Sequence, residues 1–147
     1  MKTIGQLLKE KGHEVWSVRP AEKVYDALGV MADKDVGALL VMDGEKVVGV
    51  FSERDYARKV ILKNKASKKI AVREIMSAFV ISIPPTLDCN QALVLMTAKH
   101  VRHLPVLEDG KLIGVVSIGD LVNAVMGEQK LAIDKLEQYI LEHMSLT

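Results

Sequence analysis

Apolar positions in the first half of the chain follow first a strand-like and then a helix-like spacing. Residues 15–18 alternate as a short strand, and Pro20 favours the first turn of a helix after it. The helix itself is predicted by apolar residues three and four positions apart, Val24, Ala27, Leu28 and Met31. The pattern therefore predicts a strand followed by an amphipathic helix.

A second pair of strands follows. Residues 38–42 are continuously apolar, which predicts a strand buried on both faces, and residues 46–51 form its expected partner. Asp43-Gly44 between them is a hairpin turn signal, because both residues tolerate positive φ. Another helix is expected after Ser52.

The same pattern occurs a second time at a constant offset of 65 residues, so that residues 18–57 align with residues 83–122. Twelve of the 40 aligned positions are identical, against the two or three that chance would give at ordinary residue frequencies. The second copy has its own Asp-Gly turn signal, at Asp109-Gly110. Two copies without a third indicate a pseudo-symmetric pair of units rather than a solenoid. We expect an α/β (α+β) fold of two β-α-β-β-α repeats, packed through their sheets.

Further helices are predicted outside the two repeats. Residues 3–9 read as a helix with a Thr3–Gln6 capping box and a stop at Gly12, and residues 72–76 precede the second repeat in a similar place. Residues 128–144 form an amphipathic helix with Ile133, Leu136, Ile140 and Met144 on one face. Such a helix must cover either its own chain or a second chain. The predicted organisation is a first repeat with the N-terminal helix, a basic linker, a second repeat and a C-terminal helix, at residues 1–62, 63–71, 72–126 and 127–147.

Composition narrows the class of protein. The chain has 147 residues, is 49% hydrophobic and carries a net charge of +1, which gives no support to nucleic acid or an anionic membrane as a partner. It has one cysteine, and its N-terminal sequence lacks an apolar signal core. We therefore expect a cytoplasmic protein.

A Ser-x-x-Asp motif follows the last strand of each repeat, in GVFSERD (49–55) and GVVSIGD (114–120). One interpretation is a helix cap, in which Ser and Asp satisfy free backbone N–H groups. The other is a nucleotide site, in which the carboxylate accepts hydrogen bonds from ribose hydroxyls and the helix N-terminus favours a phosphate. The glycine before each motif would allow close approach of the backbone.

These motifs, together with RHLPV (102–106) and VREIMS (72–77), resemble a tandem pair of cystathionine-β-synthase (CBS) domains, a Bateman module. The resemblance covers about residues 1–126 and implies a regulatory protein, not an enzyme, that binds AMP, ADP, ATP, NAD(H) or S-adenosylmethionine in two clefts. It implies a nucleotide ligand rather than a catalytic cofactor. It also implies a homodimer and a separate target protein.

In that family each cleft combines residues of both repeats. The first cleft would contain Ser52, Arg54, Asp55, Arg58, Arg102, His103, Leu104 and Pro105. The second would contain Val18, Arg19, Gly37, Ala38, Leu39, Ser117 and Asp120. Because Gly37-Ala38 and Ile118-Gly119 replace charged residues of the family pattern, we predict a phosphate-demanding first cleft and a weaker second one. The arginines favour AMP, ADP, ATP or NAD(H) over a sulfonium ligand.

Other functions remain as alternatives. Cys89 lies in the first turn of a predicted helix, but its counterpart Val24 is apolar, so we expect Cys89 in the core rather than as a nucleophile. His100 and His103 are spaced like a metal pair but lack further ligands, and no metal site is predicted. The alternative hypotheses are a protein-interaction scaffold without a ligand and an S-adenosylmethionine sensor.

Overall fold

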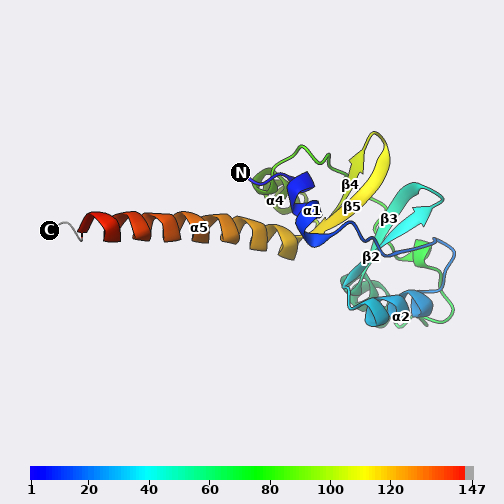
Figure 1. Cartoon of the computed structure of the whole chain (residues 1–147). Helices are drawn as coiled ribbons and strands as arrows, with labels where there is room; N and C mark the ends of the chain where they lie inside the picture. The colour runs from blue at the N-terminus through cyan, green and yellow to red at the C-terminus, as the bar shows by residue number, and fades with distance from the viewer. Residues whose placement is uncertain (145–147) are drawn as a thin grey trace.

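The computed structural model describes residues 1–144, and Figure 1 shows two small α/β units and one long projecting helix. The first unit contains β1 (Ser17–Val18), α2 (Val24–Lys34), β2 (Ala38–Asp43), β3 (Lys46–Ser52), α3 (Glu53–Tyr56) and the π-helix η1 (Ala57–Ile61). The second contains α4 (Cys89–Lys99), β4 (His103–Glu108), β5 (Lys111–Ser117) and the start of α5 (Ile118–Met144). Helix α1 (Ile4–Lys11) and the 3-10 helix η2 (Val72–Glu74) complete the structure.

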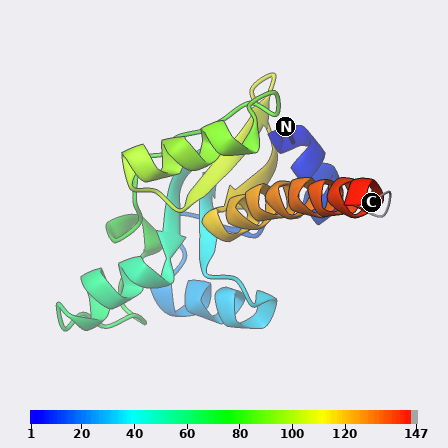
Figure 2. The ribbon, with the colours of Figure 1, turned by 90° about the vertical axis from the view of Figure 1, so that its left-hand side faces the viewer.

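The two sheets repeat the same register, which confirms the internal repeat in three dimensions. In the first sheet β1 runs parallel to β2, and β2 pairs antiparallel with β3 so that Ala38 faces Ser52. In the second, β4 and β5 pair so that His103 faces Ser117, 65 positions along from the first pair. Strand β1 has only a single-bridge counterpart in the second unit, the parallel bridge of Ile83 to Val106. Figure 2 shows the strands of both units in the middle of the molecule, with α2 at one end and α4 at the other.

Each unit has its own aliphatic core, and each core includes residues of a segment outside its repeat. Helix α1 packs on the second unit, where Ile4 and Leu8 are fully buried. Val72 and Ile75 are instead buried in the core of the first unit. The chain therefore crosses between the units twice, although α1 precedes the first repeat in the sequence.

These crossings explain the close contacts at Gly49 and Gly114. A Cβ added at Gly49 would lie 2.6 Å from Sδ of Met76, and one at Gly114 would lie 2.7 Å from Cδ2 of Leu8. The expectation that these glycines allow a close approach to the backbone is thus confirmed, with segments of the chain itself as the close neighbours. The two glycines make room for the segment that packs on each sheet.

The structure corrects four predicted elements. The helix expected to open at Pro20 begins at Val24, because the carbonyls of Pro20 and Glu22 accept hydrogen bonds from the backbone of Arg73 and Val72. The strand expected at residues 15–18 shortens to 17–18. The first hairpin turn is Gly44-Glu45 rather than Asp43-Gly44, because Asp43 is still paired with Lys46. The second turn, Asp109-Gly110, is confirmed, with positive φ at both residues.

The fourth correction concerns the C-terminal helix. It is not a separate element starting at Glu128 but the continuation of α5, which runs through Gly127 for 27 residues. Ile133, Leu136 and Ile140 are exposed on it, so this helix does not cover its own chain within the described residues. The side chain of Met144 and residues 145–147 lie outside the described part. In contrast, the N-terminal capping box of Thr3 and Gln6 and the helix stop at Gly12 are confirmed.

Candidate nucleotide site

The two Ser-x-x-Asp motifs form the same strand-to-helix corner. In the first, Ser52 Oγ accepts a hydrogen bond from the amide of Asp55 at 3.1 Å, and Asp55 Oδ2 accepts one from the amide of Ser52 at 3.0 Å. In the second, the corresponding distances between Ser117 and Asp120 are 3.1 and 2.8 Å. Both motifs are therefore helix caps, and each also presents a carboxylate at a helix N-terminus.

Each carboxylate is paired with a lysine. Lys59 Nζ lies 3.2 Å from Asp55, one turn along the same helical segment, and also donates to the carbonyl of Ile75. Lys11 Nζ lies 3.0 Å from Asp120 and donates to the carbonyl of Val115 at 2.8 Å. Lys11 comes from the last turn of α1, so the packing of α1 on the second unit delivers this charge.

A cavity of about 410 Å³ opens between the two units at the Ser117–Asp120 corner. This volume falls within the range of about 300–1,000 Å³ that small-molecule sites occupy. Its walls combine Lys11, His103 and Asp120 with aliphatic residues of the first unit, and two further acidic residues, Glu14 and Asp35, also line it. It is lined by Lys11, Gly12, Glu14, Trp16, Asp35, Val36, Gly37, Ala38, Leu39, Leu40, Val50, His103, Val115, Ser117 and Asp120.

The structure brings together most residues predicted for the second cleft. Five of them line the cavity: Gly37, Ala38, Leu39, Ser117 and Asp120. Val18 is instead buried in the first core, and the Arg19 side chain is exposed and lies 3.6 Å from Glu22. His103, predicted for the first cleft, lines this cavity.

The remaining first-cleft residues lie in two groups. Ser52 and Asp55 form the corner described above, with Arg54 and Arg58 exposed on the helical segment after it. Leu104 and Pro105 are buried in β4, and Arg102 before them is exposed. The residues predicted for the first cleft thus lie partly on the first unit and partly on the second. The 410 Å³ cavity lies at the second predicted cleft.

Lys11 and Trp16 are cavity residues that sequence reasoning missed. Nothing in the sequence indicates that α1 packs on the second repeat, so the position of Lys11 could not be predicted. Trp16 is the single tryptophan of a chain poor in aromatics and is 37% exposed, with Lys34 Nζ 4.6 Å from its ring. The sequence signal for Trp16 is a lone tryptophan at a predicted strand in a chain with few aromatic residues.

The surroundings of the cavity favour the ionised form of Asp120 and the neutral form of His103. Partial burial would raise the pKa of Asp120, but hydrogen bonds from Ser117 and the nearby Lys11 ammonium outweigh it, so this pKa lies below its ordinary value. Burial lowers the pKa of His103, against the opposing charge of Asp120. At neutral pH the cavity therefore presents an ionised Asp120, the cation of Lys11 and an uncharged His103.

Cys89 has the environment of a core residue, as predicted. It is 2% exposed, belongs to the hydrophobic cluster of the second unit, and burial raises the pKa of its thiol. A buried thiol with a raised pKa is a poor nucleophile.

Comparison with known proteins identifies the repeats. The family model named CBS domain matches residues 11–62 and again residues 72–127. The chain belongs to the CBS-domain family. The two α/β units are thus its two CBS domains, and the resemblance seen in the sequence is confirmed. No helix within residues 1–144 has the length and apolar character needed to cross a membrane.

Similar proteins of known sequence or structure also contain CBS domains. The CBS domain-containing protein CBSX3, mitochondrial, of Arabidopsis thaliana is 36% identical over 94% of this chain and 71% of its own length. The chain spans 54% of the related protein MK0525 of Methanopyrus kandleri. The crystal structure of the CBS-domain protein NE2398 is 46% identical, with a TM-score of 0.82 over 86% of this chain and 99% of that one. A CBS-domain protein of Burkholderia ambifaria is also 46% identical, with a TM-score of 0.83 over 87% and 96%. The chain therefore shares the fold of stand-alone CBS-domain proteins, a regulatory and signalling family.

Proposed function

We propose that this CBS-domain protein binds an adenosine-containing nucleotide, namely AMP, ADP, ATP or NAD(H), and signals energy or redox state to a partner protein in the cytoplasm. The observation that carries this proposal is the 410 Å³ cavity between the two units, with Asp120 at its wall. A carboxylate at a helix N-terminus, next to an aliphatic slot, suits a ribose joined to a flat base.

Each part of the nucleotide has a matching part of the cavity. Asp120 would accept hydrogen bonds from the ribose hydroxyls, in place of its present contact with Lys11. The backbone of Gly37 to Leu39 would read the edge of the adenine, and Trp16 offers an aromatic face beside it. Lys11, once released from Asp120, would pair with a phosphate, as charge-assisted hydrogen bonds are the strong ones.

The presence of Lys11 in the cavity supports a different ranking of the two clefts. The predicted ranking rested on the lack of charged residues in the second cleft, and the structure supplies a lysine from α1. We therefore propose the second cleft as the main nucleotide site. Asp55 is paired with Lys59. The first cleft, which would combine Asp55 with Arg54, Arg58 and Arg102, is proposed as a second site for phosphate-bearing ligands.

Calorimetric titration of ligand-stripped protein with AMP, ATP, NADH, S-adenosylmethionine and adenosine tests this proposal. We expect AMP to bind more tightly than adenosine, because only AMP engages Lys11. Asp120→Asn should remove the binding at the second cleft, since an amide cannot replace the anionic acceptor, while its amide oxygen can still accept the hydrogen bond from the backbone N–H of Ser117.

Asp55→Asn is the matched control, because it makes the same change at the equivalent corner of the first unit. Binding that is lost only in Asp120→Asn places the main site in the cavity. No heat with any ligand would favour the interaction scaffold, and preferential binding of S-adenosylmethionine would favour the sulfonium sensor. Recovery of the nucleotide unchanged would support a sensor rather than an enzyme.

A further inference from the structure

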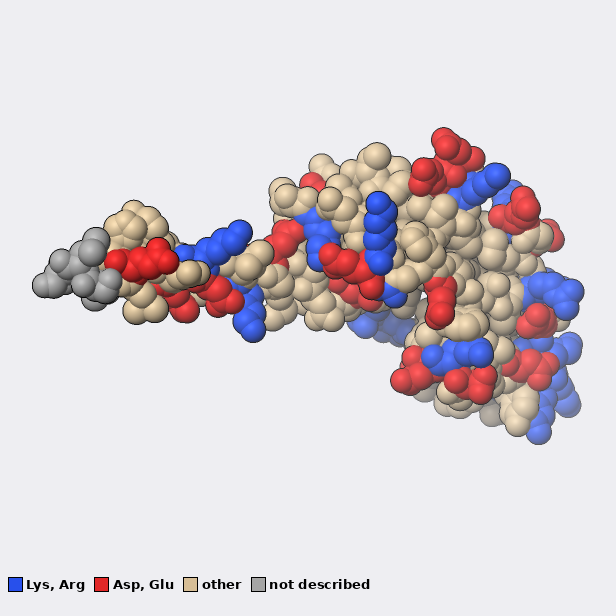
Figure 3. Space-filling view, in the orientation of Figure 1, with Lys and Arg blue, Asp and Glu red and all other residues tan. Residues whose placement is uncertain are grey.

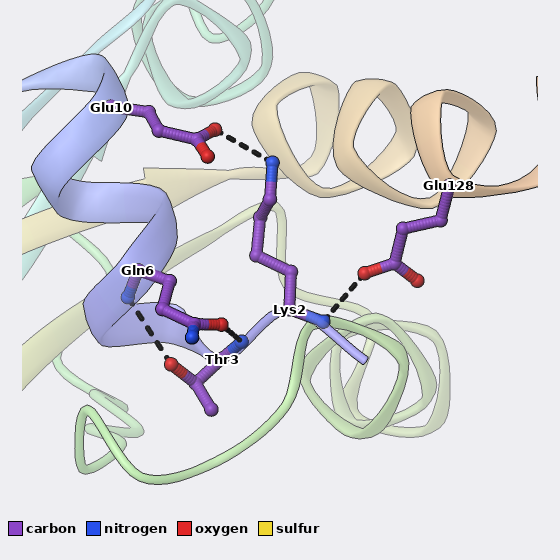
Figure 4. A network of polar contacts seen from close by, with 5 residues as sticks. All are labelled: Lys2, Thr3, Gln6, Glu10 and Glu128. Atoms are coloured by element: carbon purple, nitrogen blue, oxygen red, sulfur yellow. Dashed lines mark hydrogen bonds and ion pairs between the residues drawn. The ribbon is translucent and has the colours of Figure 1, made fainter. Parts of the chain in front are cut away.

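Helix α5 extends far beyond the unit to which it belongs. Leu121 and Ala124 pack in the core of the second unit, and the rest of the helix projects away from the body (Figure 1), with residues 129–143 exposed. At 1.5 Å per residue the helix is about 40 Å long. Its root is anchored, because the backbone N–H of Lys2 donates a hydrogen bond to Glu128 and Lys2 Nζ pairs with Glu10 of α1 at 2.6 Å (Figure 4).

One face of this projecting helix carries a continuous apolar stripe. Its members are spaced alternately four and three residues apart, with Gln129 as the one polar position: Val122, Met126, Gln129, Ile133, Leu136 and Ile140. Their apolar side chains are 37–60% exposed, although large hydrophobic residues at this spacing are normally covered. This spacing is typical of the seam of a two-stranded coiled coil.

The charges beside the stripe indicate how a partner would lie. Lys130 and Glu137 border the stripe on the same side, one heptad apart, while Ala132 and Tyr139 border the other side. Within residues 1–144 neither Lys130 nor Glu137 belongs to an ion pair. Figure 3 shows charges of both signs along this helix, separated by uncharged surface.

We propose that α5 pairs in antiparallel orientation with α5 of a second copy of this chain. With Ile133 opposite Leu136 of the second copy, Lys130 lies next to Glu137 of the second copy, and two-fold symmetry repeats both contacts. In a parallel pair the bordering positions would instead bring Lys130 and Glu137 against the uncharged side of the other helix. Because Lys130 and Glu137 match only in the antiparallel register, we infer that the partner of this helix face is a second copy of the chain.

This pairing does not depend on nucleotide binding. The two Ser117–Asp120 corners lie at the N-terminal ends of the two helices, and an antiparallel pair holds those ends apart. The two cavities therefore lie at opposite ends of the helix pair.

Sedimentation equilibrium of the full chain tests the proposal. We expect a mass of twice the 16.2 kDa chain, and a monomer for Leu136→Asp, whose exposed position leaves the fold intact by circular dichroism. Lys130→Glu and Glu137→Lys should each weaken the dimer about tenfold, because each replaces two attractions by two repulsions. Combining the two substitutions should restore the wild-type dissociation constant.

Lys135→Glu is the matched control, as it reverses a lysine on the opposite face of the same helix and should leave the dimer unchanged. A monomeric wild-type chain would overturn the proposal and would indicate that the apolar stripe binds a different protein. A dimer that survives Leu136→Asp, or a charge reversal without rescue in the double variant, would equally contradict this pairing.

Discussion

Asp55 and Asp120 occupy equivalent positions in the two repeats, yet each is paired with a lysine from a different part of the chain. Lys59 follows Asp55 in the same helical segment, whereas Lys11 reaches Asp120 from α1. The corners themselves could be predicted, because a Ser-x-x-Asp cap is a local arrangement set by four consecutive residues. The lysines could not, since the contact of Lys11 depends on where α1 packs.

His103 provides a test at this scale, because it lines the cavity near Asp120 and burial lowers its pKa below 6.5. The unfolded chain therefore binds more protons than the folded one as pH falls below about 6.5. Stability that is present above this pH is lost as pH falls through the lowered pKa. We expect His103→Gln to show a smaller fall in melting temperature between pH 7 and pH 5 than the wild type.

The control for this experiment is His143→Gln, on the projecting part of α5, which should follow the wild-type pH dependence. Melting curves by circular dichroism at several pH values provide the measurement. An unchanged fall in His103→Gln would show that another group controls stability in this range.

At the scale of elements, hydrophobic spacing predicted the strands and helices of both repeats well. Their ends were less predictable where distant backbone groups intervene. The start of α2 at Val24 rather than Pro20 follows from hydrogen bonds that residues 70–73 make to the turn before it. A separate helix was predicted from residue 128, but α5 runs through Gly127 without a break.

Glycine substitutions test the packing of the crossing segments on the sheets. Gly49→Ala places a methyl group 2.6 Å from Met76 Sδ and 2.9 Å from the carbonyl oxygen of Ser77. Because the latter is backbone and cannot rotate away, we expect a loss of about 1–3 kcal/mol in the free energy of unfolding, measured in urea. Gly29→Ala, in exposed surroundings on α2, should instead stabilise the protein by about 1 kcal/mol.

Equal effects of the two substitutions would mean that Gly49 is not tightly packed. The comparison is informative because both variants add the same methyl group to the same unit.

At the scale of the whole molecule, the sequence repeat predicted two similar units, and the structure adds how they are joined. Helix α1 completes the second core and the 72–75 segment completes the first. The offset of 65 residues contains no information about this crossing, because it compares each repeat with the other and not with the segments between them. The crossing places the Lys11 cation at the cavity between the units and so joins the fold to the proposed site.

The measurement that tests the central claim most directly is an amide NMR titration of the ligand-stripped protein with AMP. We predict saturable shifts of the amides of Gly37 to Leu39 in the first unit and of Ser117 to Asp120 in the second, since both groups line the same cavity. Asp120→Asn should abolish these shifts while leaving the rest of the spectrum folded. Shifts confined to other residues, or none at saturating AMP, would contradict a nucleotide site between the two CBS domains.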